Sequence, residues 1–250
     1  MREHRIIKTF RLLELEGITK HFGGLSVLTD ISFNVEVGEI VGLIGPNGAG
    51  KTTLFNVITG IYRPDKGAIR FHGKNLVGLR PHQICRRGIA RTFQLVRIFP
   101  SMTALENVLV GAIYSKRGKR KQFLNQALEC LKILNLEELK DTTSAHLTHS
   151  DRRLVETAAA LASQPTLALL DEPLAGLNPS EIEKVIKIIK EIRDQRGISI
   201  LWIEHKIDAV FNICDRVVVL EYGLKIADGK PEEIGKDPKV IKAYLGESHA

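Results

Sequence analysis

Length, composition and charge exclude several classes of protein. The 250 residues are 44% hydrophobic and 26% charged, and no apolar run approaches the ~18–20 residues that span a bilayer, so the chain is not expected to be an integral membrane protein. The formal net charge of +7 is concentrated in segments 2–11 and 115–122, which disfavours a nucleic-acid partner, and three scattered cysteines indicate neither a disulfide framework nor a metal site.

The first part of the chain is expected to be rich in strands. Residues 1–11 form a basic N-terminal extension that lacks the apolar core of a signal peptide. Residues 12–72 contain stretches in which apolar and polar residues alternate, separated by glycine turns. Within them a helix is predicted over 51–59, and Gly60 is its C-terminal cap.

A glycine-rich loop follows the apolar strand 39–44 and leads into a helix at Lys51. Its sequence is a complete Walker A motif, in which glycines let consecutive backbone N–H groups point at phosphate oxygens. Lys51 is expected to reach the outer phosphates and Thr52 to ligate Mg²⁺, while the helix N-terminus adds partial positive charge. The predicted phosphate-binding residues are Gly45, Pro46, Asn47, Gly48, Ala49, Gly50, Lys51, Thr52 and Thr53.

The middle of the chain, from about residue 78 to 163, changes to helical periodicity. Thr103 and Glu106 have the spacing of a capping box, and residues 126–134 place apolar side chains on one helical face. The basic run 115–122 is interpreted as a solvated loop, with contact to anionic lipid headgroups or to an acidic partner loop as the alternative. This region is therefore expected to be a helical insertion.

Strand patterns return in the last part of the chain. Buried strands are predicted at 167–170 and 198–203, and a hairpin over 216–228. Between the first two strands, Asn178 and Pro179 predict the start of a helix, as N-cap and first helical residue. No internal repeat or second domain is evident.

Two acidic residues follow the strand predicted at 167–170. An apolar strand that delivers Asp171 and Glu172 to a sheet edge is a Walker B arrangement. Asp171 is expected to hold Mg²⁺, through water, and Glu172 to polarise an attacking water as general base. Together with the Walker A loop, the pair indicates a P-loop NTPase.

Further residues make the chain similar to the ATP-binding cassette (ABC) family over about residues 12–246. Phe22 matches the aromatic residue that stacks on adenine in that family. Gln94 matches the glutamine that contacts Mg²⁺ and senses the membrane partner, and His205 matches the switch histidine that contacts the γ-phosphate. Residues 175–178 occupy the position of the family's D-loop.

The resemblance implies an α/β P-loop fold of ABC type with a mixed sheet core, an antiparallel β subdomain and an inserted helical subdomain. The single ATPase domain is expected over 12–246, with the helical insertion at about 95–163. ATP and Mg²⁺ are the implied cofactors. The implied metal-binding residues are Thr52, Gln94 and Asp171, and the implied catalytic residues are Glu172, His205 and Lys51.

One motif departs from the family pattern. The family signature, Leu-Ser-Gly-Gly-Gln, corresponds here to residues 147–151, and in the family it caps the γ-phosphate bound by the opposite subunit. Thr148 keeps the hydroxyl, whereas Ser150 replaces a glycine where backbone and phosphate approach closely. Both residues are expected to contact nucleotide, with hydrolysis slower than with glycine at 150.

Three segments resemble the ATP-binding subunits of importers of branched-chain amino acids and of their urea and amide relatives: 88–94 with 99–100, 174–179 and 237–246. The last of them is shared with ATPases of lipopolysaccharide export. The resemblance implies a motor subunit that pairs with a second copy or a paralogue. It also implies contact with integral-membrane permease subunits, indirect work with a solute-binding protein, and a peripheral position on the cytoplasmic face of the membrane.

Other functions stay open at this point. A lipid or lipopolysaccharide exporter ATPase and a non-transport ABC ATPase are the main alternatives, although a DNA-handling ABC ATPase needs coiled-coil arms for which 250 residues leave no room. A small-molecule kinase would lack the set of Gln94, Thr148 and His205. A nucleotide sensor without turnover is distinguished by the effect of Glu172→Gln.

Overall fold

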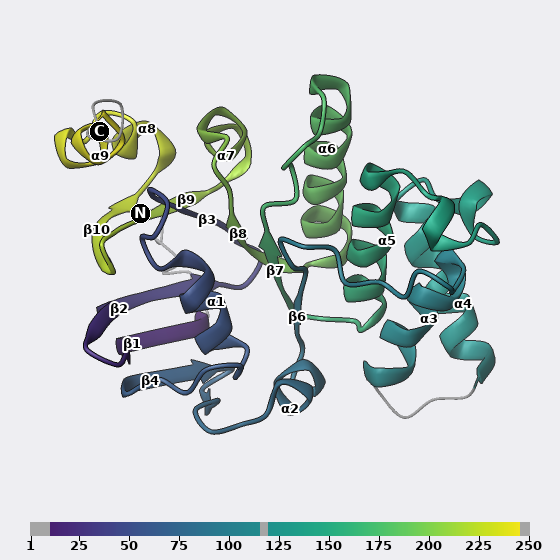
Figure 1. Ribbon diagram of the computed structural model, residues 1–250, viewed down its shortest axis with the longest axis horizontal. Coiled ribbons are helices and arrows are strands. Elements are labelled where there is room, and N and C mark those ends of the chain that lie inside the picture. The colour runs from purple at the N-terminus through teal and green to yellow at the C-terminus, as the bar shows by residue number, and fades with distance from the viewer. Residues whose placement is uncertain (1–10, 116–119, 246–250) are drawn as a thin grey trace, which may run out of the picture.

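A computed structural model describes residues 11–115 and 120–245 (Figure 1). All of the predicted N-terminal extension except Arg11 lies outside the described residues, as does the centre of the basic run, 116–119. Among the described residues, no helix is both long and apolar enough to cross a membrane.

A six-stranded mixed sheet forms the centre of the fold. Its order is β10-β9-β3-β8-β7-β6, and every neighbouring pair is parallel except β9 and β10, which form the predicted antiparallel hairpin. Strands β3, β7 and β8 are buried throughout, as expected for continuous apolar runs in a parallel sheet. The strands are β3 (Ile40–Ile44), β6 (Ile89–Arg91), β7 (Leu167–Asp171), β8 (Ser199–Ile203), β9 (Arg216–Glu221) and β10 (Leu224–Gly229).

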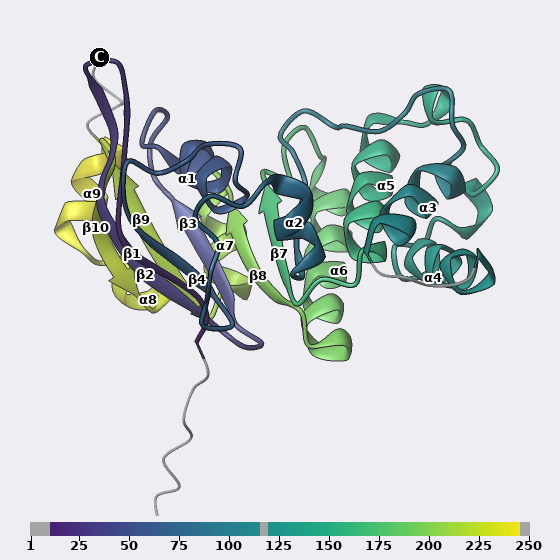
Figure 2. The same ribbon diagram turned by 90° about the horizontal axis from the view of Figure 1, so that it is seen from below.

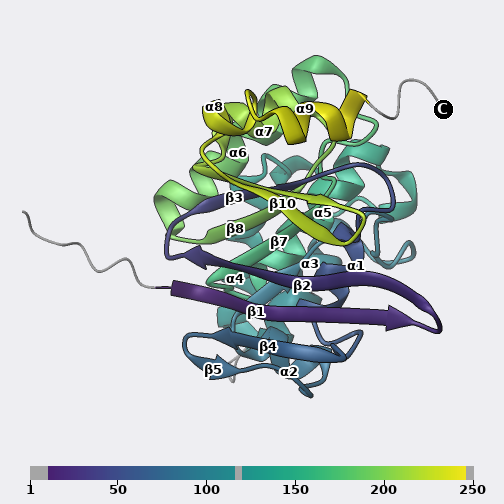
Figure 3. The same cartoon turned by 90° about the vertical axis from the view of Figure 1, so that its left-hand side faces the viewer.

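An antiparallel sheet forms a second layer. Its order is β2-β1-β4-β5, and Figure 3 shows these strands side by side. Helix α1 lies between the two sheets, because its buried Leu54, Phe55 and Ile58 belong to a hydrophobic cluster that contains strand residues of both. The elements are β1 (Arg11–Phe22), β2 (Leu25–Glu36), β4 (Lys66–Phe71), β5 (Lys74–Asn75) and α1 (Lys51–Ile58). The expected mixed core and antiparallel β layer are thus confirmed.

Helices α3, α4 and α5 gather at the end of the molecule remote from the antiparallel sheet (Figures 1 and 2). The capping box at the start of α3 is confirmed by reciprocal hydrogen bonds between Thr103 and Glu106. The helices outside the antiparallel layer are α2 (Pro81–Arg86), α3 (Ala104–Ser115), α4 (Arg120–Ile133), α5 (His149–Ala162), α6 (Pro179–Arg196), α7 (Ile207–Ile213), α8 (Pro231–Ile234) and α9 (Pro238–Leu245), with single 3₁₀ turns at Glu137–Leu139 and Ser144–His146.

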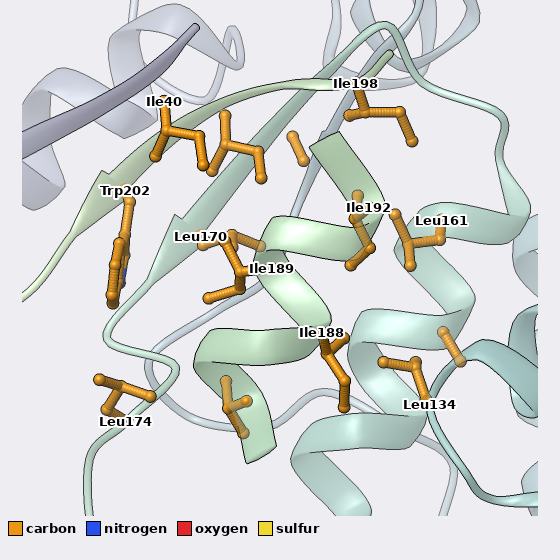
Figure 4. Close-up of a cluster of buried hydrophobic side chains, with 14 of the residues drawn as sticks. Ile40, Leu134, Leu161, Leu170, Leu174, Ile188, Ile189, Ile192, Ile198 and Trp202 are labelled. Carbon is orange, nitrogen blue, oxygen red and sulfur yellow. The ribbon is translucent and has the colours of Figure 1, made fainter. Parts of the chain in front are cut away.

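Helix α6 joins the helical end to the sheet. Figure 4 shows Ile188, Ile189 and Ile192 of α6 beside Leu170 of β7 and Leu161 of α5, all in one buried cluster. Close packing of this kind resists displacement of one element against the next. The strand that ends at the Walker B acids and the helix that begins within the signature therefore share one core.

Strand β6 is a difference from the sequence prediction. The region from 78 to 163 was expected to be helical, yet Ile89–Arg91 pairs in parallel with β7 at the edge of the central sheet. A strand of three residues has too little periodicity to be recognised. Its position matters, because it delivers the segment that contains Gln94 to the end of β7.

Candidate nucleotide-binding site

The Walker A loop joins β3 to α1 in a conformation that its glycines permit. Gly45 and Gly50 have φ values of 146° and 99°. A Cβ at Gly45 would collide with the carbonyl of Leu220, and one at Gly50 would lie 2.8 Å from the carbonyl oxygen of Val27. The loop is therefore pressed against neighbouring backbone, and only glycine fits at both positions.

Lys51 lies over this loop. Its buried side chain donates from Nζ to the carbonyl oxygens of Gly45, at 2.7 Å, and Pro46, at 2.8 Å. Thr52 and Thr53 follow in the first turn of α1, and the backbone N–H groups at the start of a helix favour anions. The predicted phosphate-binding residues thus surround one helix N-terminus.

The Walker B aspartate is held by an arginine. Asp171, at the end of β7, accepts a hydrogen bond at Oδ2 from Arg91 Nη2 at 2.8 Å, and both side chains are almost fully buried. Arg91 Nη1 donates to Asn56 Oδ1 of α1 at 2.6 Å. Burial raises the pKa of Asp171, and Arg91 opposes that shift. Neither Arg91 nor Asn56 was expected from the sequence to have this role, because β6 is too short to be recognised as a strand.

The three predicted metal-binding residues share one cavity. Thr52, Gln94 and Asp171 line a space of ≈ 280 Å³ between α1 and the segment after β6. Within the described part of the chain, Asp171 Oδ1 is buried with no hydrogen-bond partner. A hydroxyl, an amide and a free carboxylate oxygen match the oxygen ligands that Mg²⁺ prefers. The residues present therefore fit this ion.

Glu172, Gln94 and His205 meet although they are far apart in sequence. Glu172 Oε2 accepts from Gln94 Nε2 at 3.1 Å, and Glu172 Oε1 lies 3.0 Å from His205 Nε2. Glu172 has a φ of 51°, a left-handed conformation that non-glycine residues adopt at a cost of about 1–2 kcal/mol. Such strain is found where a side chain must be aimed. Here it turns the carboxylate toward both partners.

Glu204 organises the backbone next to His205. Its buried carboxylate accepts from the backbone N–H of Leu174 at 2.9 Å, and from those of His205 and Lys206 at 2.8 and 3.2 Å. Glu204 thereby ties the loop after Glu172 to the loop that carries His205. This role was not expected from the sequence, because the partners of Glu204 are backbone groups.

Phe22 lies at the end of β1, on the rim of the fold. Its ring is partly exposed and meets Tyr62 edge to face, with centroids 5.0 Å apart. Tyr62 also lines the cavity of Thr52 and Asp171. A partly exposed aromatic ring at this position is suited to stacking on a planar base.

The signature residues lie apart from this cavity. Thr148 caps α5: its Oγ1 accepts from the Asp151 backbone N–H at 3.1 Å and donates to Asp151 Oδ2 at 2.6 Å. Ser150 is the second residue of α5 and has no positive φ, so this helical turn accommodates a side chain without backbone strain. Neither residue lines the cavity of Thr52, Gln94 and Asp171.

Comparison with known proteins agrees with this geometry. The ABC transporter family matches residues 28–175, and the C-terminal family described as branched-chain amino acid ATP-binding cassette transporter matches 225–250. The chain is 39% identical to the high-affinity branched-chain amino acid transport ATP-binding protein BraF of Pseudomonas aeruginosa and 41% identical to LivG of Salmonella typhimurium. Each alignment covers 95% of this chain and 98% of the relative.

Solved structures give the same result. A crystal structure of the ADP conformation of an ATP-binding cassette has a TM-score of 0.87 and 35% identity, and covers 95% of this chain and 100% of its own. A dimeric post-hydrolysis cassette bound to ADP and phosphate has a TM-score of 0.80 and 27% identity, and covers 88% and 99%. The similarity extends over nearly the whole chain.

Proposed function

Because the chain belongs to the ABC transporter family of ATP-binding proteins, we propose that it is the motor subunit of an importer of branched-chain amino acids or a related amide or urea solute. The chain is a transporter ATPase, as its family and its relatives are. The observation that carries the proposal is the meeting of Glu172, Gln94 and His205 beside the Walker residues. The solute class is supported by the BraF and LivG relatives and by the C-terminal match.

The chemistry follows from the positions of these side chains. The backbone N–H groups of the Walker A loop and Lys51 hold the phosphates, and Phe22 stacks on the adenine. Glu172 takes a proton from the attacking water, and its position beside His205 and Gln94 aims it at the γ-phosphate. Thr52, Gln94 and Asp171 would hold Mg²⁺, which supplies positive charge to the phosphate oxygens when bound.

The permease subunits are proposed to dock in a groove beside Gln94. A cavity of ≈ 310 Å³ lies between α2, β6, α3 and α5, and most of its lining is apolar. Arg91, Arg97 and Glu156 are the charged side chains among its lining residues. An apolar groove with few charges fits a short amphipathic helix of a membrane partner. We therefore propose a peripheral position on the cytoplasmic face of the membrane, with a solute-binding protein on the other side.

A second ATP-binding subunit is proposed to complete each site. Dimeric structures are known among the similar cassettes, and Thr148 and Ser150 lie outside the cavity of their own chain, as expected if they cap the nucleotide of the opposite subunit. A head-to-tail partner, either a second copy or a paralogue, would bring its own Thr148 to the γ-phosphate. An exporter ATPase, the alternative function, would use the same head-to-tail pair of subunits and would differ only in what the permease carries.

Uptake by the reconstituted transporter tests the proposed function. With permease subunits and solute-binding protein in vesicles, we expect ATP-dependent uptake of labelled leucine or isoleucine, or else of urea. Lys51→Ala should abolish uptake, because Lys51 neutralises the phosphates, whereas Lys184→Ala on the exposed face of α6 should leave it intact. Uptake unaffected by Lys51→Ala, or ATP-dependent lipid export with no solute uptake, would contradict the proposal.

Ser150 is expected to make ATP hydrolysis slower than it would be with glycine at this position. Replacement by glycine lets the backbone approach a partner-bound phosphate more closely, so Ser150→Gly should raise the ATPase rate of the assembled complex, by up to about 10²-fold. Ser180→Gly is the matched control, because Ser180 is the second residue of α6. An unchanged or lower rate with Ser150→Gly would show that the serine does not limit hydrolysis.

A further inference from the structure

Helix α5 contacts the segment around Gln94 through two side chains one turn apart. Arg153 and Glu156 both reach residues 93–97, which lead from β6 toward α3. Figures 1 and 2 show α5 between α6 and the α3–α4 pair, so it borders both the sheet and the helical end. Residues three apart on a helix share a face. The two side chains therefore form one contact surface.

Arg153 binds two carbonyl groups of the catalytic region. Its Nη1 donates to the backbone oxygen of Glu172 at 2.7 Å, and its Nη2 to that of Gln94 at 3.3 Å. Its Nε lies 3.1 Å from Nε2 of His149 in the signature. The planar guanidinium suits such simultaneous contacts, since its donors point in fixed directions. One side chain thus joins the Gln94 segment, the Glu172 turn and the signature.

Glu156 binds the same segment from the next turn. Its Oε1 accepts from the Arg97 backbone N–H at 2.9 Å, and the Phe93 backbone N–H also stabilises the carboxylate. Glu156 is 7% exposed. Burial raises its pKa to about 7, whereas these N–H groups and the charges of Arg153 and Arg97 oppose the shift. A carboxylate in this position is costly unless its hydrogen bonds are kept.

Residues 93–97, the segment that Arg153 and Glu156 hold, separate the groove from the catalytic residues. Phe93, Arg97 and Glu156 line the groove of ≈ 310 Å³, and Phe93, Arg153 and Glu156 also line a cavity of ≈ 20 Å³ together with Asp171. The Arg97 guanidinium carbon lies over the Phe93 ring, 4.1 Å from the ring centroid. Whatever occupies the groove therefore touches the segment that α5 holds.

We propose that Arg153 and Glu156 are positioning residues that fix the Gln94 segment and the Glu172 turn to the signature helix, so that a displacement in the groove moves all three together. This inference depends on the proposed function, because it takes the occupant of the groove to be a permease helix. Neither side chain touches the reacting atoms in this arrangement. Their effect is on where Glu172 and Thr148 lie.

The test compares variants in the permease complex in vesicles with solute-binding protein. Arg153→Met and Glu156→Ala should lower kcat of solute-stimulated ATP hydrolysis by about 10- to 100-fold, the loss typical of slight misplacement. KM for ATP should change by less than about twofold, because the phosphate loop and Phe22 are untouched. Glu156→Gln should recover part of the stimulation, because an amide oxygen still accepts an N–H. Arg152→Met is the matched control, since Arg152 donates to Ala145 instead.

A second measurement needs neither solute nor permease. In the isolated chain, amide hydrogen exchange at Phe93 and Arg97 should be faster in Glu156→Ala than in the parent and in Arg152→Met. Equal loss of basal and stimulated rates with a raised KM, equal effects of Arg152→Met and Arg153→Met, or unchanged exchange would overturn the proposal. If solute does not stimulate ATP hydrolysis by the parent complex, the proposed function is contradicted instead. The hydrogen-exchange result would then still decide whether Glu156 holds residues 93–97.

Discussion

Glu172→Gln is expected to lower steady-state ATP hydrolysis by about 10²- to 10⁴-fold while leaving ATP binding intact. The amide keeps a polar group beside Gln94 and His205, at the 3.1 and 3.0 Å contacts of the carboxylate. It cannot take a proton from water. The phosphate loop and Lys51 are unchanged, so nucleotide should remain bound. Phosphate release by the permease complex measures the rate, and equilibrium binding of labelled ATP measures affinity.

The same variant should trap the ATP-bound dimer. If each site is closed by the signature of a second subunit, ATP that is not hydrolysed keeps the two subunits together. Light scattering during gel filtration in ATP should then show twice the monomer mass for Glu172→Gln, and the monomer mass without nucleotide. Glu183→Gln, on the exposed surface of α6, is the matched control. Unchanged turnover in Glu172→Gln would favour a nucleotide sensor over a motor.

Features set by neighbouring residues could be predicted from the sequence. The Walker A loop, the capping box of α3, the Asn178 cap of α6 and the hairpin of β9 and β10 depend on a few consecutive residues with particular backbone needs. Family resemblance added Phe22, Gln94 and His205. In the structure, the side chains of Gln94 and His205 lie within hydrogen-bond distance of the Glu172 carboxylate, whereas their roles in catalysis stay predictions.

Features set by distant residues could not be predicted. The contacts of Arg91 with Asn56 and Asp171 join residues 35 and 80 positions away. The sequence contains no local pattern for them. Glu204 binds backbone N–H groups, which every residue but proline offers. Strand β6 is too short for its periodicity to be seen, and it exists because β7 offers an edge with which to pair.

The buried pair of Arg91 and Asp171 leads to the largest expected loss of stability. Arg91→Met keeps most of the volume between α1 and β7 but leaves Asp171 buried, with neither oxygen bonded to an arginine. Breaking a buried pair from one side typically costs about 3–5 kcal/mol. We expect the free energy of unfolding, measured by urea denaturation, to fall by this amount. Hydrolysis should fall as well, since Asp171 moves or takes up a proton.

Two further variants distinguish the loss of the buried Arg91–Asp171 pair from the loss of any arginine in this part of the chain. Arg87→Met removes an arginine four residues earlier, which donates to the Asn75 carbonyl at an exposed site, and it should cost less than about 1 kcal/mol. Asp171→Asn in the Arg91→Met background removes the unpaired charge, so it should recover roughly half of the lost stability without restoring hydrolysis. Equal losses in Arg91→Met and Arg87→Met would mean that the buried charge of Asp171 does not depend on its arginine. Recovery of hydrolysis in the double variant would mean that the Asp171 carboxylate is not needed for the metal.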